Sequence, residues 1–535
     1  SVPHRPASSM STCASVSGMS PDASPPSRLL GDDPRDGSSE RPDELGREAF
    51  ALYLAQLIEN VRDQSESSVM ALIGDWGSGK TSILKLLRRR LDIASASNWL
   101  LAEFNPWTYP DAASLQRGFF NELTAALPRN ERPTGARAKV GELAMTLSPI
   151  GKLGGLVGVD AEGMIRAFAD VVAGDMSASA AQRAAEEALR RIQRPILMVI
   201  DDLDRLTPDE LLEVLKLVRL VGRLPHVYYL LSYDERTLLD VLRRTPVAGD
   251  DEARARAYLE KIVQVRLDMP SLRWAQRASL LERGLTSILS SSKVALSDAD
   301  RRRLDTLYSE VLDRRLTTPR AISRFLGQVQ AFYVPLRGEV DFVDFFLLSW
   351  LRTQEPGVHA MLHRERDAAL GRDGSPWGFR QRDAATVESR RTFWLAHLKA
   401  AKVSRDHRDG VIRVLSDLFP DIRAAFDGSS GVRATEDRAT PMAVSNTDYF
   451  DRSFVFGVPE DDLPDSTVDR ALRALEGGGS SAPALLRLTR ELKTNTGLAL
   501  RKIDAARRLG AVLPEAAIFD LLARTWSEVE QRNQE

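Results

Sequence analysis

A glycine-rich segment in the first quarter of the chain has the residue types needed to hold a polyphosphate. It fits the pattern G-x-x-x-x-G-K-[ST] and, with the next residue, comprises Gly74, Asp75, Trp76, Gly77, Ser78, Gly79, Lys80, Thr81 and Ser82. Glycines let backbone amides fold closely around phosphate oxygens, and a helix that begins at Lys80 would direct its positive end toward them. We expect Lys80 to reach the β- and γ-phosphates and the Thr81 hydroxyl to bind Mg²⁺. This Walker A motif predicts binding of ATP and Mg²⁺, although nothing in it reads the base.

Two adjacent carboxylates form the second candidate group. Asp201 and Asp202 directly follow the apolar run Ile196–Ile200, which is typical of a buried strand. In α/β sheets, ligands bind at the carboxyl ends of the strands. Asp201 is therefore placed to hold Mg²⁺ as a Walker B carboxylate, and Asp202 could polarise the attacking water as a general base. The alternative is a strand that ends in a capped turn, but the Walker A motif favours the catalytic interpretation.

Three further residues are candidates for contacts with the γ-phosphate. Ser232 follows the predicted strand Val227–Leu231 and could contact the γ-phosphate or the water, whereas Asp234 is better explained as a helix N-cap. A helix with proline at its first position carries Arg320 and, one turn later, Arg324. A guanidinium from a helical lid would neutralise charge on the γ-phosphoryl group. A solvated or carboxylate-paired arginine remains the alternative for both.

Other conspicuous side chains have simpler interpretations. The runs Arg88–Arg90 and Arg301–Arg303 could touch phosphate backbones, but a solvated helix face explains such runs more often. Trp76 and Trp107 are expected to pack near the site rather than to bind anything specific. These residues therefore add no separate function.

The elements around these motifs alternate between strand and helix. Short apolar runs predict strands, and apolar residues at helical spacing predict the helices between them. The predicted strands are Val69–Ile73, Asn98–Phe104, Ile196–Ile200, Val227–Leu231 and Val263–Leu267, and the predicted helices are Glu44–Val61, Ser82–Leu91, Pro208–Val221 and Glu235–Arg244. This order predicts an α/β fold, a P-loop NTPase parallel sheet flanked by helices, followed by mainly α-helical lid and C-terminal regions.

The same patterns suggest where the domains begin and end. The first residues are rich in Ser, Pro, Ala and Gly and have few large apolar groups, so we expect them to be disordered. Strand patterns fade after about residue 270. The predicted domains are a disordered segment 1–35, a P-loop core 36–270 with a helical insertion at about 110–190, a helical lid 271–340 and a helical C-terminal domain 341–535.

Composition limits the classes of partner. The 535 residues are 43% hydrophobic and 28% charged, with a net charge of −2. This net charge does not indicate a nucleic-acid partner, although nucleic acid stays possible through a local basic patch. Cys13 is the single cysteine, and one thiol cannot form an intrachain disulfide, which fits a reducing cytoplasm. No apolar run reaches the length of a membrane span, and the N-terminus lacks a secretory core. We expect a cytoplasmic protein without membrane contact.

The combination of motifs resembles the KAP family of P-loop NTPases over about residues 40–335. The motifs that carry the resemblance are Gly74–Thr81, Phe104-Asn105-Pro106-Trp107, Ile200-Asp201-Asp202-Leu203-Asp204-Arg205, Tyr258-Leu259-Glu260-Lys261-Ile262 and Thr318-Pro319-Arg320 through Arg324-Phe325. Leu45-Gly46-Arg47 is similar to the N-terminal motif of the family, which implies that Arg47 lies near the base or ribose. Many members carry transmembrane helices between the two nucleotide motifs. Here Lys80 and Asp201 are 121 positions apart, but the segment between them cannot span a membrane.

The resemblance implies an ATP-hydrolysing, nucleotide-driven switch that often forms homo-oligomers. No nuclease, protease or deaminase pattern follows about residue 340, so we expect a separate effector or adaptor protein as partner. Bacterial members are frequent in anti-phage defence, so we expect a multi-component antiviral system. One alternative is a scaffold that hydrolyses ATP slowly or not at all. Another is an ATPase that nucleic acid stimulates, as in a motor or loader, against which the near-neutral charge argues mildly.

Overall fold

In the computed structural model the described residues form two compact units. The sheet unit comprises Asp32–Arg277 with Thr317–Ala321, and the helical unit comprises Ala278–Leu316 with Ile322–Glu535. The structure describes residues 34–62, 67–93, 99–128, 135–147, 178–192, 194–221, 224–372, 384–427, 440–477 and 482–534. Residues 1–33 of the predicted disordered segment 1–35, and residues 129–134 and 148–177 of the predicted insertion at about 110–190, lie outside the described residues.

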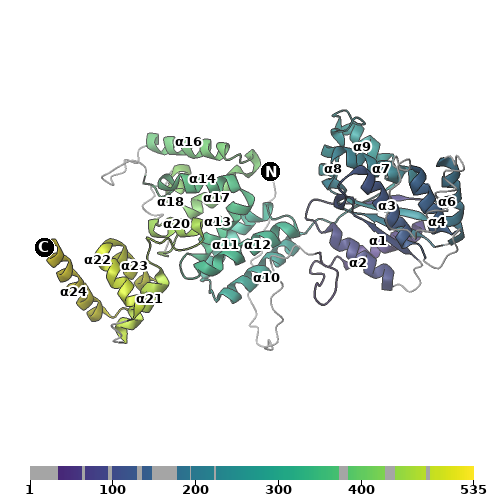
Figure 1. The fold of residues 1–535 in the computed structure, drawn as a ribbon. Coiled ribbons are helices and arrows are strands. Elements are labelled where there is room, and N and C mark those ends of the chain that lie inside the picture. Colours follow the sequence, from purple (N-terminus) through teal and green to yellow (C-terminus); the bar gives the residue numbers. More distant parts are fainter. Residues whose placement is uncertain are drawn as a thin grey trace. The chain divides into compact units, whose positions relative to one another are not determined.

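A five-stranded parallel sheet forms the centre of the sheet unit (Figure 1). Its spatial order is β2-β3-β4-β1-β5, and every neighbouring pair is parallel. The strands are β1 Val69–Ile73, β2 Leu100–Phe104, β3 Ile196–Ile200, β4 Val227–Tyr233 and β5 Val265–Asp268. The predicted bounds of β1 and β3 are confirmed. The predicted end of β4 is wrong, because the strand continues through Ser232, which pairs with Leu72 of β1.

Side chains of β1 alternate between two apolar cores, as expected for a strand buried on both faces. Val69, Ala71 and Ile73 belong to one core, and Met70 and Leu72 belong to the other. The first core packs under α3 Ala112–Ala126, α4 Ala136–Leu147, α6 Ala178–Ile192, α7 Pro208–Val221, α8 Glu235–Arg243 and α9 Glu252–Glu260. The second packs under α1 Glu48–Val61 and α2 Lys80–Ile93. The prediction of helices on both faces of a parallel sheet is thus confirmed.

Short 3₁₀ helices follow two strands at the edge where ligands bind in such sheets. They are η1 Pro106–Thr108, after β2, and η2 Leu203–Arg205, after β3. The Asn105 side chain caps η1 by accepting from the Trp107 amide at 3.1 Å. Both turns carry motif residues, so the ends of β2 and β3 present polar side chains at one edge of the sheet.

The helical unit contains no described strand. Its helices are α10 Trp274–Ser292 and α12 Pro319–Tyr333, whose first turns group with the sheet unit, and α11 Asp298–Glu310, η3 Leu312–Arg314, η4 Val334–Leu336, α13 Phe342–Gln354, α14 Pro356–Arg364, α15 Arg366–Ala369, α16 Ala384–Ala400, α17 Arg405–Leu418, α18 Pro420–Asp427, α20 Thr447–Val455, α21 Asp465–Glu476, α22 Pro483–Thr494, α23 Thr496–Arg508 and α24 Glu515–Gln534. In the part of the chain that the structure describes, no helix has both the length and the apolar character to cross a membrane.

Buried ion pairs join helices within the helical unit. Arg303 of α11 donates to Asp344 of α13 at 2.6 Å and to Asp417 of α17 at 2.7 Å. The interpretation of Arg301–Arg303 as a solvated face is therefore wrong for Arg303, because carboxylates from two other helices surround its guanidinium. Asp341 lies 3.9 Å from the same guanidinium.

Candidate nucleotide-binding site

The segment between β1 and α2 forms the glycine-rich loop that the sequence predicts. Gly77 and Gly79 have φ of +77° and +94°, a region that favours glycine. Lys80 begins α2, and its Nζ donates to the carbonyl of Gly74 at 2.8 Å. The lysine therefore folds over the start of its own loop, and the first amides of α2 face the loop as a helix N-terminus does.

The ends of β3 and the loop meet at a hydroxyl–carboxylate pair. Thr81 Oγ1 donates to Asp201 Oδ2 at 2.9 Å, although the two residues are 120 positions apart. Only β4 separates β1 from β3 in the sheet, so their carboxyl ends lie close enough for this contact. A hydroxyl and a carboxylate are oxygen ligands that suit Mg²⁺, and the pair is the donor set expected for one ion.

Asp202 is held by contacts on both of its carboxylate oxygens. Asn105 Nδ2 donates to Oδ2 at 3.2 Å, and Arg205 Nε lies 2.9 Å from Oδ1. The backbone of Asp202 is left-handed, with φ of 61°, a region that Asp tolerates better than most residues. Burial and the neighbouring Asp201 raise the pKa of Asp202, and Arg205 opposes that shift.

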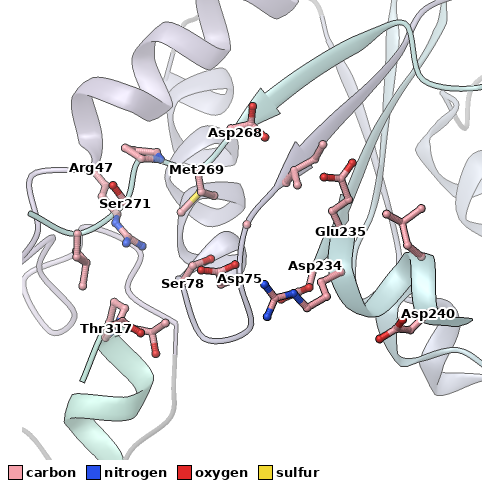
Figure 2. Close-up of a pocket in the computed structure, with 18 of the residues that line it drawn as sticks. Arg47, Asp75, Ser78, Asp234, Glu235, Asp240, Asp268, Met269, Ser271 and Thr317 are labelled. Carbon is pink, nitrogen blue, oxygen red and sulfur yellow. The ribbon is translucent and has the colours of Figure 1, made fainter. Parts of the chain in front are cut away.

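A cavity of about 640 Å³ opens beside the loop, within the size range of small-ligand pockets. Figure 2 shows Arg47 and Thr317 on one side of the loop and Asp234 and Glu235 on the other. The lining residues are Arg47, Ile73, Gly74, Asp75, Ser78, Asp234, Glu235, Arg236, Leu239, Asp240, Glu252, Arg256, Asp268, Met269, Pro270, Ser271, Leu272, Arg277, Thr317, Thr318 and Pro319. Polar and apolar groups together suit a nucleoside.

Arg47 lies against the loop and is almost fully buried, with 6% of its surface exposed. A Cβ at Gly79 would overlap its Nη1. Burial lowers the pKa of Arg47, and Asp43 opposes the shift. The structure gives its guanidinium no hydrogen bond or ion pair with any described residue. Because Asp43 acts on the guanidinium without forming an ion pair with it, burial of this charge is costly, and the site fits an anionic ligand. The predicted contact of Arg47 with base or ribose stays a prediction.

Asp234 has a second contact that the sequence did not reveal. Its side chain accepts from Thr237 N at 3.1 Å, which confirms the predicted N-cap of α8. It also accepts from the Trp76 amide of the glycine-rich loop at 2.7 Å, across 158 positions. Asp234 thus ties the end of β4 to the loop. Its place three residues beyond a predicted central strand was the signal that could have suggested this.

Three predicted γ-phosphate contacts, Ser232, Arg320 and Arg324, lie in different parts of the structure. Ser232 is fully buried in β4, does not line the cavity, and its Oγ has no hydrogen-bond partner among the described residues. The backbone amide of Arg320 donates to Gly77 O at 3.4 Å. Arg324 belongs to the helical unit. The structure therefore brings Arg320 to the loop, and the roles of all three residues stay predictions.

Two exposed tryptophans enclose Arg205. Its Cζ lies 4.9 Å from the ring centroid of Trp76 and 4.9 Å from that of Trp107. Arg320 Cζ lies 5.8 Å from the Trp76 ring on the same loop. The expectation that both tryptophans pack near the site is confirmed. The arginine between them has no separate signal in the sequence, because it belongs to the acidic motif that follows β3.

Residues 47–334, more than half of the chain, match the KAP family P-loop domain. The chain belongs to the KAP family. A relative of this KAP protein is the phage T7 exclusion protein of Escherichia coli K12, 24% identical over 446 residues, or 74% of this chain and 56% of the relative. The chain thus spans about half the length of that relative. As a family member it has a nucleotide-binding P-loop domain.

The solved structures that the chain matches include two proteins of Aeropyrum pernix. The ORC2 protein in its ADPNP and ADP complexes matches with a TM-score of 0.27 and 13% identity, over 95% of this chain and 98% of that chain. The ORC1 protein in complex with DNA matches with a TM-score of 0.29 and 14% identity, over 70% of this chain and 92% of that chain. We draw no functional argument from matches this distant.

Proposed function

We propose that this KAP protein is an Mg²⁺-dependent ATPase that acts as a nucleotide-driven switch. The observation that carries the proposal is the 2.9 Å contact between Thr81 Oγ1 and Asp201 Oδ2, beside a glycine-rich loop and a helix N-terminus. When bound, Mg²⁺ would neutralise charge on the β- and γ-phosphates. Thr81 and Asp201 are the residues that would hold it.

Each part of the site has a role in this proposal. Lys80 leaves the Gly74 carbonyl and places its charge on the phosphates, and the amides of the loop donate to phosphate oxygens. Asp202 accepts a hydrogen bond from the attacking water and orients it. Arg47 supplies a buried positive charge at the loop, and Arg320 adds a second from the start of α12. The cavity takes the nucleoside.

Steady-state phosphate release with MgATP tests hydrolysis. Wild type should release phosphate, and Asp202→Asn should reduce turnover by about 100-fold while ATP still binds. Lys80→Ala should lose ATP binding itself, measured by calorimetry. Equal turnover of wild type and Asp202→Asn would remove Asp202 from the mechanism. Binding without phosphate release in wild type would instead support the ATP-bound scaffold.

The contacts on both oxygens of Asp202 favour slow basal hydrolysis. A carboxylate that already accepts from Asn105 and pairs with Arg205 must exchange a contact before it can orient water. We therefore expect a low resting rate that a trigger increases. Adding DNA or RNA to the phosphate assay tests the nucleic-acid-stimulated alternative, and an unchanged rate would exclude it.

A role in anti-phage defence is supported by the name of the phage exclusion relative. We expect expression of the chain, together with a separate effector or adaptor, to lower the plating efficiency of a phage, and Lys80→Ala to restore it. We also expect homo-oligomers whose size depends on ATP. Mass photometry with and without MgATP measures that size, and a particle of constant mass would argue against assembly as the output of the switch.

A further inference from the structure

Arg205 has no assigned role, although it lies beside the proposed general base. We propose that Arg205 is a positioning residue for the Asp202 carboxylate, and that Trp76 and Trp107 hold its guanidinium in place and link it to the phosphate-binding loop. This inference rests on the proposed ATPase function and concerns the same site. It gives a function to two exposed tryptophans that core packing does not explain.

The geometry shows what fixes the guanidinium. Arg205 Nε lies 2.9 Å from Asp202 Oδ1, yet among the described residues this buried N–H has no aligned hydrogen-bond acceptor. The Asp202 contact is therefore Coulombic and does not set the orientation of the guanidinium plane. The ring centroids of Trp76 and Trp107, each 4.9 Å from Arg205 Cζ, hold the cation from two directions.

The two rings come from different parts of the site. Trp76 belongs to the glycine-rich loop, between Asp75 and Gly77, and Trp107 belongs to η1 after β2. They keep 46% and 57% of their surface exposed, so a core role does not explain them. A cation–π contact is worth ~0.5–1 kcal/mol at such exposed positions, enough to bias where a flexible side chain rests.

The second oxygen of Asp202 completes the arrangement. Asn105 Nδ2 donates to Oδ2 at 3.2 Å, so the carboxylate has a neutral donor at one oxygen and the Arg205 cation at the other. We call the two tryptophan rings around that cation the clamp. Asn105 and Trp107 are neighbours at η1, where the Asn105 side chain also accepts from the Trp107 amide. Movement of η1 would therefore change both contacts of Asp202 together.

Trp76 connects the clamp with the proposed nucleotide site. The Trp76 amide donates to Asp234, and amides of this loop are the donors that a polyphosphate would engage. When phosphate draws in the loop amides, the Trp76 ring moves with its backbone. The guanidinium then follows, and Asp202 is set for water only when the loop is filled.

Trp107→Leu is the sharpest test, because it removes one side of the clamp without touching the loop or Asp202. We expect kcat to fall about 2- to 5-fold, since one exposed cation–π contact is worth about that much, while the ATP dissociation constant stays within 2-fold. Trp107→Phe should restore most of the rate, because a phenyl ring still binds the cation. Trp526→Leu, at an exposed tryptophan of the helical unit, is the matched control and should behave as wild type.

A double-mutant cycle shows whether Trp107 acts through Arg205. Arg205→Gln should lower kcat at least as much as Trp107→Leu, and the double variant should be no slower than Arg205→Gln alone. Additive losses, or a wild-type rate in Trp107→Leu, would overturn the inference while leaving the proposed function intact. Absence of phosphate release in wild type would overturn the proposed function and this inference with it.

Tryptophan emission reports on the Trp76 side. MgATP should change the emission of wild type and of Trp526→Phe, whereas most of that change should disappear in Trp76→Phe. Calorimetry on the same samples verifies that Trp76→Phe still binds MgATP. An equal change in wild type and in Trp76→Phe would overturn the link between the loop and the clamp.

Discussion

At the scale of single residues, the Thr81 hydroxyl separates metal binding from nucleotide binding. Thr81→Ala removes the 2.9 Å contact with Asp201 and one proposed Mg²⁺ ligand, but it leaves the backbone amides of the loop in place. We expect phosphate release to fall about 100-fold, with ATP binding in the absence of Mg²⁺ little changed. Thr81→Ser keeps a hydroxyl and should retain most activity. Turnover of Thr81→Ala close to wild type would exclude Thr81 as a ligand.

Asp234 gives a second prediction at this scale, because it serves both a helix and the loop. Asp234→Ala should lose about 1 kcal/mol of N-cap stabilisation and also weaken ATP binding about 10-fold, since the Trp76 amide loses its acceptor. Asp251 caps α9 by accepting from Ala253 N and Arg254 N. Asp251→Ala should therefore lower thermal stability similarly and leave ATP affinity unchanged. Equal affinity losses in both would show a general stability effect.

Sequence spacing indicated the residues whose position follows from their own motif. Thr81 sits at the start of a helix after a glycine-rich loop and Asp201 sits at the end of an apolar strand, and the structure brings the two together. The Asp234–Trp76 and Arg205–Trp107 contacts do not belong to a known motif, and they depend on which strand ends lie side by side in the sheet. Sheet order decides which strand ends meet, and spacing alone does not give that order.

At the scale of elements, Gly79 decides how closely α1 approaches the loop. Gly79→Ala would place a Cβ on Arg47 Nη1 and impose a φ of +94° on a residue with a side chain. We expect loss of ATP binding, since the loop is strained at this φ and the Arg47 guanidinium must leave its place against the loop. Gly141 lies inside α4 with open space around it, so Gly141→Ala is the control and should be neutral or stabilising by up to ~1 kcal/mol. Retained affinity in Gly79→Ala would contradict this packing.

Asp341, the N-cap of α13, predicts a pH dependence in the helical unit. Burial and the nearby Asp344 raise its pKa to about 7. Because the folded pKa lies above the unfolded value, the folded state binds more protons, and stability falls as pH rises from about 4 to about 7. Thermal unfolding should give a Tm difference between Asp341→Asn and wild type that favours the variant more at pH 8 than at pH 5. A constant difference between the two proteins would contradict the raised pKa.

The elements themselves were predictable to different degrees. Strands β1 and β3 matched because their apolar runs are bounded by polar or turn residues. β4 was predicted two residues too short, because the polar Ser232 interrupts the apolar run, although Ser232 and Tyr233 are both buried in the sheet. Arg303 lies in a run of arginines that is typical of a solvated face. The sequence did not reveal its partners Asp344 and Asp417, because they lie on other helices.

At the scale of the whole molecule, separate cores predict separate responses to ligand. Each unit has its own buried residues, and the loop, Asp201 and the cavity all belong to the sheet unit. At about 100 times the dissociation constant, ATP should stabilise that unit by ~2.7 kcal/mol. Hydrogen exchange should therefore slow first in peptides from β1, α2 and β3, and not in Lys80→Ala. Equal slowing across α13 and α17 would show that the two units unfold together.

The pairing of β2 with β3 has a consequence for how this chain can vary. These strands are parallel neighbours, with Leu100 beside Ile196, so the chain leaves the sheet after Phe104 and returns about one strand length away. Because that gap is closed by the sheet itself, a longer or shorter cassette can replace residues 148–177, between α4 and α6, without displacing Lys80 from Asp201, as long as η1 and the helices of the first core are kept. A chimera that carries a foreign helical hairpin there should keep its affinity for nucleotide while gaining or losing whatever the cassette recognises.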